Sequence, residues 1–414
     1  MRQKSLQSFI QFSPAITVII SALLLAAAAY ASSTQLIYSF AGGNDGEYLD
    51  TDLVIDSAGN LYGSSVQGGD FGSGTVFELS PAAGGWTHTV LYSFTGSADG
   101  GEPYKGVTLD PQGDIYGTAV TGGSGSCEGG CGVVFKLTKS GESWTQTVIH
   151  AFTGGKDGSG PGSGLTVDAH GNLYGMTPTG GAYGLGTVYQ LHPEASGQYR
   201  LNVIHAFTGG DDGSSGSAGR LIFDGAGNLY GVTTVGGANN DGIVFEITHH
   251  QGGTWTLLPL YAFRDQPDGA LPYGGLIFDK AGNLYGTTYY AGLHDVGTVY
   301  KLTRAGNSWK ESVLYSFKGE KDGSSPISTL VMDKAGNLYG TTSAGGGTCG
   351  CGVVFKVAHN ANGTWTETVP YRFPGAPGPG FAYNGMVTAP SGIFYGATTH
   401  GGTTNDGTIY SFAP

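Results

Sequence analysis

The chain has 414 residues, with 31 acidic residues against 18 Lys and Arg, which gives a formal net charge of −13. This acidic balance argues against nucleic acid and anionic membrane surfaces as partners, because proteins bind both through basic patches. The chain contains 77 Gly, yet 12% of its residues are aromatic, so the glycines indicate many turns rather than disorder.

The first 31 residues follow the pattern of a secretory signal peptide. Arg2 and Lys4 precede an apolar run from Ala15 to Ala28, and Ala29-Tyr30-Ala31 forms a small-x-small cleavage site. Because this run is short for a membrane span of about 20 residues, we expect cleavage before Ser32 rather than a retained anchor. The predicted mature chain, 32–414, loses two basic residues and carries a net charge of −15. We expect it to be secreted or periplasmic, without membrane insertion.

One unit recurs seven times along the mature chain, at intervals of 54 to 58 residues. Its clearest column reads Leu-Tyr-Gly or a close variant, and two further columns are aromatic in every copy. The Tyr column comprises Tyr62, Tyr116, Tyr174, Tyr230, Tyr285, Tyr339 and Tyr395. The second column comprises Phe77, Phe135, Tyr189, Phe245, Tyr300, Phe355 and Tyr410. The third comprises Phe40, Phe94, Phe152, Phe207, Phe263, Phe317 and Phe373.

Each unit contains four short runs that are typical of β-strands. In the third copy they are 165–168, 172–175, 186–191 and 199–207, each rich in β-branched or aromatic residues and bounded by turn residues. Four strands per unit, repeated seven times, predict an all-β fold with a single seven-bladed β-propeller over residues 32–414.

The two ends of the mature chain indicate how the ring closes. Residues 35–40 have the sequence of a fourth strand, whereas the last unit stops after 407–412, which has the sequence of a third strand. We therefore expect the N-terminal strand to complete blade seven, which would hide the edge strands of an open ring.

Two columns of Asp could suggest cation sites, but turns explain them better. The first lies between the first two strands, and the second forms Asp-Gly pairs after the invariant Phe. No copy has the alternating acids of an EF-hand, so we expect no bound metal, with calcium as the alternative. The first column comprises Asp56, Asp110, Asp168, Asp224, Asp279 and Asp333. The second comprises Asp45, Asp99, Asp157, Asp212, Asp268 and Asp322.

The loop between the second and third strands varies most among the copies. In a propeller it lies at the same end of the ring as the Asp-Gly loop, and we name this end the loop face. Function on propellers usually resides on such loops, although any one polar residue there could be a solvated turn. The candidate ligand-binding residues are Asn240, Asp241, Tyr273, Tyr290, His294, Asp295, His400, Asn405 and Asp406.

The four cysteines occur in two copies only. Cys127 and Cys131 are separated by three residues, and Cys349 and Cys351 by one. Export favours disulfides. A four-thiolate zinc site is the alternative, but the two pairs would lie in blades two and six, nearly opposite across the ring. We therefore expect a local disulfide within each pair.

The repeat resembles a known family. The pattern Gly-Asn-Leu-Tyr-Gly-Thr-Thr at 282–288, followed by Gly-Thr-Val-Tyr-Lys-Leu at 297–302, closely resembles the GloVer tandem repeat, over essentially the whole mature chain. The resemblance implies an exported bacterial repeat protein, often with a C-terminal surface anchor. This sequence departs from that pattern, and we expect no surface anchor here. A weaker similarity, in Asp-x-x-Gly-Asn-Leu-Tyr, links the chain to NHL-type propellers and to propeller lyases and lactonases.

No motif points to catalysis. The chain has no Gly-x-Ser-x-Gly elbow, phosphate loop or His-Glu-x-x-His, and no catalytic residues are assigned. We expect a non-catalytic binding or structural module without cofactor, which engages a carbohydrate or a protein through the loop face. The alternative is a divalent-metal-dependent lyase or lactonase. Aromatic residues that favour the binding role are Tyr104, Tyr183, Tyr273, Tyr289, Tyr290, Phe381 and Tyr383.

Overall fold

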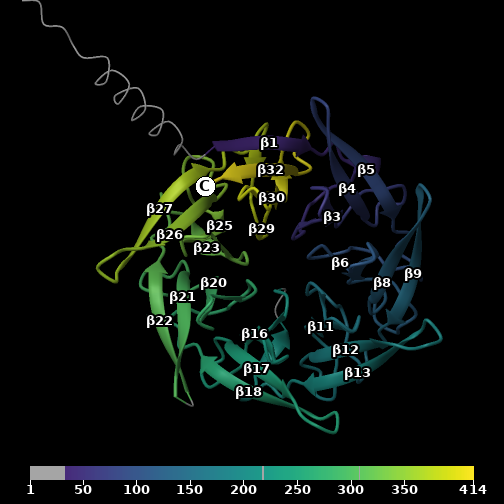
Figure 1. Ribbon diagram of the computed structural model, residues 1–414, viewed down its shortest axis with the longest axis horizontal. Coiled ribbons are helices and arrows are strands. Elements are labelled where there is room, and N and C mark those ends of the chain that lie inside the picture. Colours follow the sequence, from purple (N-terminus) through teal and green to yellow (C-terminus); the bar gives the residue numbers. More distant parts are fainter. Residues whose placement is uncertain (1–32, 217–218, 307) are drawn as a thin grey trace, which may run out of the picture.

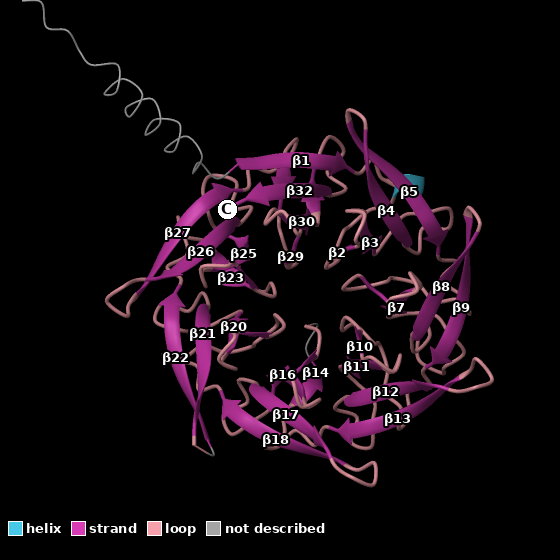
Figure 2. Cartoon of the chain, in the orientation of Figure 1, coloured by secondary structure: helices cyan, strands magenta, loops and turns pink. Residues whose placement is uncertain are grey.

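The computed structural model describes residues 33–216, 219–306 and 308–414. Seven antiparallel sheets of four or five strands form a ring around a common axis, and two further strands form a small separate sheet (Figure 1). Figure 2 shows that the regular structure is almost entirely strand; the exception in the described part is a short 3-10 helix, η1 (Gly43–Asp45). The predicted seven-bladed propeller with four strands per blade is therefore confirmed. The predicted signal peptide lies outside the described residues.

In blades one to six the strands follow one another in chain order from the axis outward, whereas the outermost strand of blade seven comes from the N-terminal part of the chain. Blade one contains β2 (Val54–Ile55), β3 (Leu61–Ser65), β4 (Thr75–Ala82) and β5 (Gly85–Ser93). Blade two contains β6 (Val107–Leu109), β7 (Ile115–Ala119), β8 (Val133–Ser140) and β9 (Ser143–Ala151). Blade three contains β10 (Thr166–Val167), β11 (Leu173–Thr177), β12 (Thr187–Pro193) and β13 (Tyr199–Ala206).

Blades four to six repeat this order, and blade seven combines both ends of the chain. Blade four contains β15 (Ile222–Phe223), β16 (Leu229–Val235), β17 (Ile243–His249) and β18 (Trp255–Ala262). Blade five contains β19 (Ile277–Phe278), β20 (Leu284–Thr288), β21 (Thr298–Ala305) and β22 (Ser308–Ser316). Blade six contains β24 (Val331–Met332), β25 (Leu338–Ala344), β26 (Val353–His359) and β27 (Trp365–Arg372). Blade seven contains β29 (Met386–Thr388), β30 (Phe394–Thr398), β32 (Thr408–Ala413) and β1 (Ser33–Ser39).

The Gly of each Leu-Tyr-Gly motif makes room for an aromatic ring on the neighbouring strand. In blade four Gly231 pairs with Phe245, and a Cβ on Gly231 would lie 2.6 Å from the Cζ of that ring. In blade five a Cβ on Gly286 would lie 2.4 Å from the Tyr300 hydroxyl. The same pairing recurs in all seven blades, at Gly63, Gly117, Gly175, Gly231, Gly286, Gly340 and Gly396. The motif is therefore required by cross-strand packing.

The same aromatic rings join each blade to the one before it. Phe94, at the end of β5, packs against Phe135 of blade two with ring centroids 5.0 Å apart and an interplanar angle of 64°. Such edge-to-face contacts add roughly 0.5–1.5 kcal/mol beyond the area that they bury. The seven pairs form a closed ring: Phe40–Phe77, Phe94–Phe135, Phe152–Tyr189, Phe207–Phe245, Phe263–Tyr300, Phe317–Phe355 and Phe373–Tyr410.

On the loop face, each blade has a short additional strand pairing that the sequence analysis did not predict. This pairing directs the chain toward the axis. The segment after each Asp-Gly position pairs with the loop that follows the second strand of the blade. The pairs are β14 (Ser214–Gly216) with β16, β23 (Ser324–Pro326) with β25, β28 (Pro379–Gly380) with β31 (His400–Gly401), and the bridges Glu47–Gln67, Gly101–Thr121, Ser159–Thr179 and Ala270–Tyr290. These contacts also place the two loop types at the same end of the ring, as expected.

Each of these ladder segments leads to a residue with positive φ. Six of the seven are not glycine, which is an uncommon backbone conformation for residues with a Cβ. Their φ values lie between 54° and 63°, at Tyr48, Glu102, Gly160, Ser215, Leu271, Ser325 and Phe381. The chain turns at these residues and then runs down the axis into the innermost strand. The described residues that follow therefore converge on the centre of the ring, where Asp52, Lys105 and Tyr383 line one cavity.

The N-terminal strand closes the ring as predicted. β1 pairs antiparallel with β32 from Ser33–Ala413 to Ser39–Thr408. The Phe40 ring is fully buried between β1 and blade one, whereas Leu36 on the same strand is 48% exposed. The strand begins two residues earlier than the sequence indicated.

The closure can be tested with variants of β1. We expect Phe40→Ala to destabilise the protein by about 3–5 kcal/mol, because it removes a fully buried ring from the inter-blade contact. Deletion of residues 35–40 should lower the melting temperature further and cause association through the exposed edge of β32. Leu36→Ala is the control and should change stability little. Thermal melts and size-exclusion chromatography measure both effects; equal melting temperatures for all variants would contradict this closure.

A single methyl group tests the Gly–aromatic pairing. We expect Gly231→Ala to destabilise the protein by about 1–3 kcal/mol, because the methyl would overlap the Phe245 ring and Leu221. Gly225→Ala, in the same blade, is the matched control: a Cβ there meets nothing within 4 Å. Denaturant unfolding would measure both free energies, and a Gly231→Ala protein as stable as the Gly225→Ala protein would refute the packing role.

Candidate functional site

The structure distributes the predicted loop-face residues over two kinds of position. Asn240 and Asn405 are turn residues: both have positive φ, and each side-chain oxygen accepts a hydrogen bond from the backbone of its own loop, from Gly236 and Gly401. Asp295 also has positive φ and accepts a hydrogen bond from Gln266 at 2.7 Å. These three side chains shape their loops.

Four other predicted residues on the loop face have separate surroundings. His294 is exposed and Tyr290 is 49% exposed. Asp241 is half-buried, and burial, followed by the nearby charges of Asp265 and Asp268, raises its pKa. The Asp406 carboxylate lies beside the Gly42 backbone, where a Cβ would meet its Oδ2 at 2.7 Å. The structure therefore does not gather these four into one site.

Tyr273 and His400 lie closer to the axis. Tyr273 is 40% exposed and packs edge-on against Tyr289, with ring centroids 5.5 Å apart. His400 contacts Tyr48 and Phe381 in edge-on geometry, at 5.6 and 5.5 Å. Tyr273 also lines a small central cavity of about 30 Å³ together with residues of blades one, two, four, six and seven.

Two tyrosines line this cavity and three more lie near them, and we name the five the tyrosine collar. They come from blades one, two, five and seven, and most of them were already noted as aromatic loop-face residues. Burial raises the pKa of Tyr104 to about 12, with further contributions from Asp50 and Tyr48. Burial also raises the pKa of Tyr383, which lies near Tyr48 and Tyr289. The collar comprises Tyr48, Tyr104, Tyr273, Tyr289 and Tyr383.

A buried polar cluster lies at the base of the collar. The Lys105 Nζ is 2.5 Å from Asp50 Oδ1 and donates to Asn384 Oδ1 at 3.3 Å. Asn384 in turn donates to the Leu49 carbonyl at 3.0 Å. Burial acts to lower the pKa of Lys105, but the charges of Asp50 and Asp52 outweigh it and raise that pKa. Lys105 therefore keeps its charge in the centre of the ring.

Two further charged residues, Arg220 and Asp52, lie further along the axis. Arg220 extends from blade four to donate to the Val107 carbonyl of blade two at 2.5 Å and to the Leu165 carbonyl of blade three at 3.2 Å. Asp52 of blade one accepts a hydrogen bond from the Gly385 amide of blade seven at 2.9 Å. Arg220 and Asp52 thus connect five blades at the centre of the propeller.

Sequence reasoning missed these central residues, although a signal was present. In the column of Lys105 the other copies have small or neutral side chains: Thr51, Ser163, Gly219, Gly274, Ser328 and Asn384. In the column of Asp52 and Arg220 the others are Gly106, Gly164, Gly275, Thr329 and Gly385. Charged residues that interrupt columns of small residues mark the site, because only there do all seven repeats meet.

The Asp side chains of the Asp-Gly column hold their loops in place by hydrogen bonds. Each of its Asp side chains is bonded to the ring seven positions earlier on the outer strand; Tyr92, for example, donates to Asp99 at 2.9 Å, and His205 lies 2.8 Å from Asp212. Burial acts to raise the pKa of Asp99, but hydrogen bonds, chiefly from Thr95, hold it below its ordinary value. The six pairs are Tyr38–Asp45, Tyr92–Asp99, His150–Asp157, His205–Asp212, Tyr261–Asp268 and Tyr315–Asp322.

The other Asp column forms the tight turns at the opposite end of the ring. Asp168 accepts hydrogen bonds from the His170 and Asn172 amides at 2.8 and 2.9 Å and from the Tyr174 hydroxyl at 3.1 Å. Within the residues that the structure describes, no three His, Cys, Asp or Glu side chains are grouped so that they could hold a metal ion.

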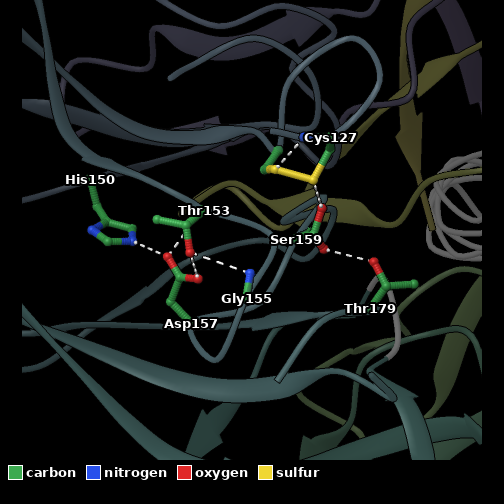
Figure 3. Close-up of a disulfide and its surroundings, with 8 residues drawn as sticks. Cys127, His150, Thr153, Gly155, Asp157, Ser159 and Thr179 are labelled. Carbon is green, nitrogen blue, oxygen red and sulfur yellow. Dashed lines mark hydrogen bonds and ion pairs between the residues drawn. A yellow bond between two sulfur atoms is a disulfide. The ribbon is translucent and has the colours of Figure 1, made fainter. Parts of the chain in front are cut away.

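The structure contains the disulfides Cys127–Cys131 and Cys349–Cys351, with the expected pairing. Figure 3 shows the first of them against the loop of the next blade, where the Cys127 sulfur lies 3.3 Å from the Ser159 hydroxyl. A Cβ on Gly154 would meet both sulfurs of this bridge, and one on Gly375 would meet both sulfurs of the other. Each disulfide therefore packs against the following blade on the loop face.

The ring of blades and the converging loops define a repeat-built β-propeller. A sequence family, the Gloeobacter/Verrucomicrobia repeat, matches residues 27–222 and 217–414. The chain belongs to this repeat family, which confirms the resemblance seen in its sequence. No curated protein matches the chain.

Solved structures support the fold. A Lactobacillus plantarum protein aligns with a TM-score of 0.56 at 14% identity over 86% of this chain and 99% of that one. The extracellular domain of a candidate hybrid two-component system from B. thetaiotaomicron gives 0.54 at 10% identity, over 91% and 39%. A candidate 6-phosphogluconolactonase from Bacteroides uniformis gives 0.50 at 13%, over 89% of each chain. At these identities the likeness shows the fold alone. Among the described residues, no helix is long and apolar enough to span a membrane.

Two outer strands bury a glutamate beside an Asp of the Asp-Gly column. Burial, followed by the charge of Asp268, raises the pKa of Glu311 to about 7, and Glu367 beside Asp322 behaves in the same way. Glu311 Oε1 and Asp268 Oδ1 are buried without a hydrogen-bond partner among the described residues. The protonated form of Glu311 is therefore the favoured form in the folded protein at mildly acidic pH.

This arrangement predicts a loss of stability as the pH rises. The folded-state pKa of Glu311 lies above its ordinary value of 4.5, so its contribution is complete below about pH 4.5 and is lost as the pH passes 7. After allowance for solvent screening, Glu311→Gln should recover about 1–2 kcal/mol at pH 8. Denaturant unfolding at pH 5 and pH 8 measures this, with the exposed Glu142→Gln as control. An equal pH dependence in the Glu311→Gln protein and the wild type would refute it.

Proposed function

We propose that the protein is an exported, non-catalytic propeller that binds carbohydrate at the tyrosine collar. The observation that carries this proposal is the convergence of five tyrosines on the Lys105–Asp50–Asn384 cluster at the mouth of the axis. A sugar presents apolar C–H faces together with hydroxyl groups. Aromatic faces beside a few fixed donors and acceptors are complementary to both.

The disulfides support a location outside the cytoplasm. Disulfides persist in oxidising compartments and are rare in reducing ones, and this chain forms two on its loop face. Together with the predicted signal peptide, they favour a secreted or periplasmic protein. The collar would then meet extracellular or cell-wall carbohydrate.

Variants of the collar test carbohydrate binding. We expect hits for the purified protein on a glycan array, and Tyr383→Ala should weaken the affinity for the best hit about tenfold or more, because it removes a stacking ring. Tyr183→Ala is the matched control, since Tyr183 is 64% exposed on the loop face and is not part of the collar. Calorimetry measures the affinities, and melting curves establish that each variant is folded.

The same samples test the alternatives. Binding that Tyr183→Ala abolishes and Tyr383→Ala leaves intact would move the site to the rim. An array without hits, followed by selective capture of a protein partner, would favour protein recognition instead. Mass spectrometry of the glycan after incubation with divalent cations tests the metal-dependent lyase or lactonase, and chemical turnover would contradict a non-catalytic module.

A further inference from the structure

A second cavity lies on the axis, on the far side of the charged residues from the collar. Its volume is about 280 Å³. The chain runs from the loop face through Asp52 and Arg220 into the innermost strands, so this cavity belongs to the end of the ring that carries the tight turns. Half-buried apolar side chains of β2, β15, β19 and β29 line it: Val54, Ile222, Ile277 and Val387.

The inner end of this cavity carries two opposite charges. Asp52 and Arg220 both line it, and no salt bridge joins them among the described contacts. Burial lowers the pKa of Arg220, and the charge of Asp52 opposes this effect from a longer distance. Lys105 is different, because Asp50 contacts it directly. Arg220 uses two N–H groups on backbone carbonyls, and Asp52 uses Oδ1 on the Gly385 amide. A guanidinium has five N–H donors and a carboxylate two acceptor oxygens, so both groups retain capacity for a ligand.

Glycines leave space for Arg220 and for the backbone of Asp52. A Cβ on Gly164 would lie 2.5 Å from the Arg220 Cγ, and one on Gly106 would lie 2.2 Å from the Asp52 carbonyl oxygen. The close approach explains why this column has small residues in blades two and three. A larger side chain at Gly106 or Gly164 would keep the Asp52 and Arg220 segments from meeting at the axis. The two charges are thereby held at fixed places on the cavity wall.

We propose that this cavity binds a small apolar α-amino acid as its zwitterion, with the carboxylate at Arg220 and the ammonium group at Asp52. Two half-buried opposite charges that interact with each other only at longer range each favour a counter-charge in direct contact. A zwitterion supplies both and adds no net charge to the interior. The apolar wall formed by Val54, Ile222, Ile277 and Val387 then accommodates an aliphatic side chain and disfavours a polar one.

Matched ligands test the two charges separately. Leucine carries both charges, N-acetyl-leucine only the carboxylate, and leucinamide only the ammonium group. In calorimetry with the full chain, we expect leucine to bind and each derivative to bind about tenfold or more weakly, because charge-assisted hydrogen bonds are the strong ones. Absence of leucine binding, or equal affinity for all three ligands, would overturn the proposal.

Variants locate the site and separate it from the collar. Asp52→Asn keeps an acceptor for the Gly385 amide and should reduce the affinity for leucine to that for N-acetyl-leucine. Val387→Trp fills the cavity without touching the collar, so it should abolish leucine binding and leave glycan binding unchanged. Leu258→Ser, on the exposed outer strand β18, is the control. Melting curves establish folding. Leucine binding that survives Val387→Trp would overturn the proposal, whatever the outcome for glycans.

Discussion

The propeller depends on one contact repeated seven times: an aromatic ring on the third strand of each blade. On one side the ring lies over the Gly of the Leu-Tyr-Gly motif, and on the other it meets the Phe at the end of the preceding blade. The ring therefore takes part in packing both within a blade and between neighbouring blades. Overpacking and cavities are both costly in such an interior, so the glycine and the ring constrain each other's size.

These contacts explain why the fold was readable from the sequence. Columns such as Gly231 with Phe245 recur because each blade solves the same packing problem, and a repeated solution is visible within a single chain. The Asp columns were also read as turns, and the structure shows the hydrogen bonds of those turns, as at Asp168. The ladder beside the axis escaped notice, because isolated bridges such as Glu47–Gln67 leave no hydrophobic pattern.

The candidate site was only partly predictable, for a related reason. Tyr273 and Tyr383 stood out as aromatic loop residues, but loop-face residues such as Asn240 proved to be turn formers. The central residues Lys105 and Arg220 depend on contacts across 55 or more residues of chain, such as the hydrogen bond between Arg220 and Val107. No local pattern reports such contacts. The signal for these long-range contacts is a departure from the repeat. A charged residue in a column of small residues has no role inside its own blade, so it indicates a contact with another blade.

The pairing of β1 with β32 also has a consequence for how the protein forms. Among the described strands, β1 pairs with β32, which follows it by more than 360 residues. Long-range contacts of this kind slow folding, because the loop must be closed before the contact is gained. Blades one to six can assemble in the order of synthesis, each onto the one before. The seventh blade, and with it the closed ring, is complete only after β32 has been synthesised. A ligand that binds at the axis can therefore find its site only in the closed ring.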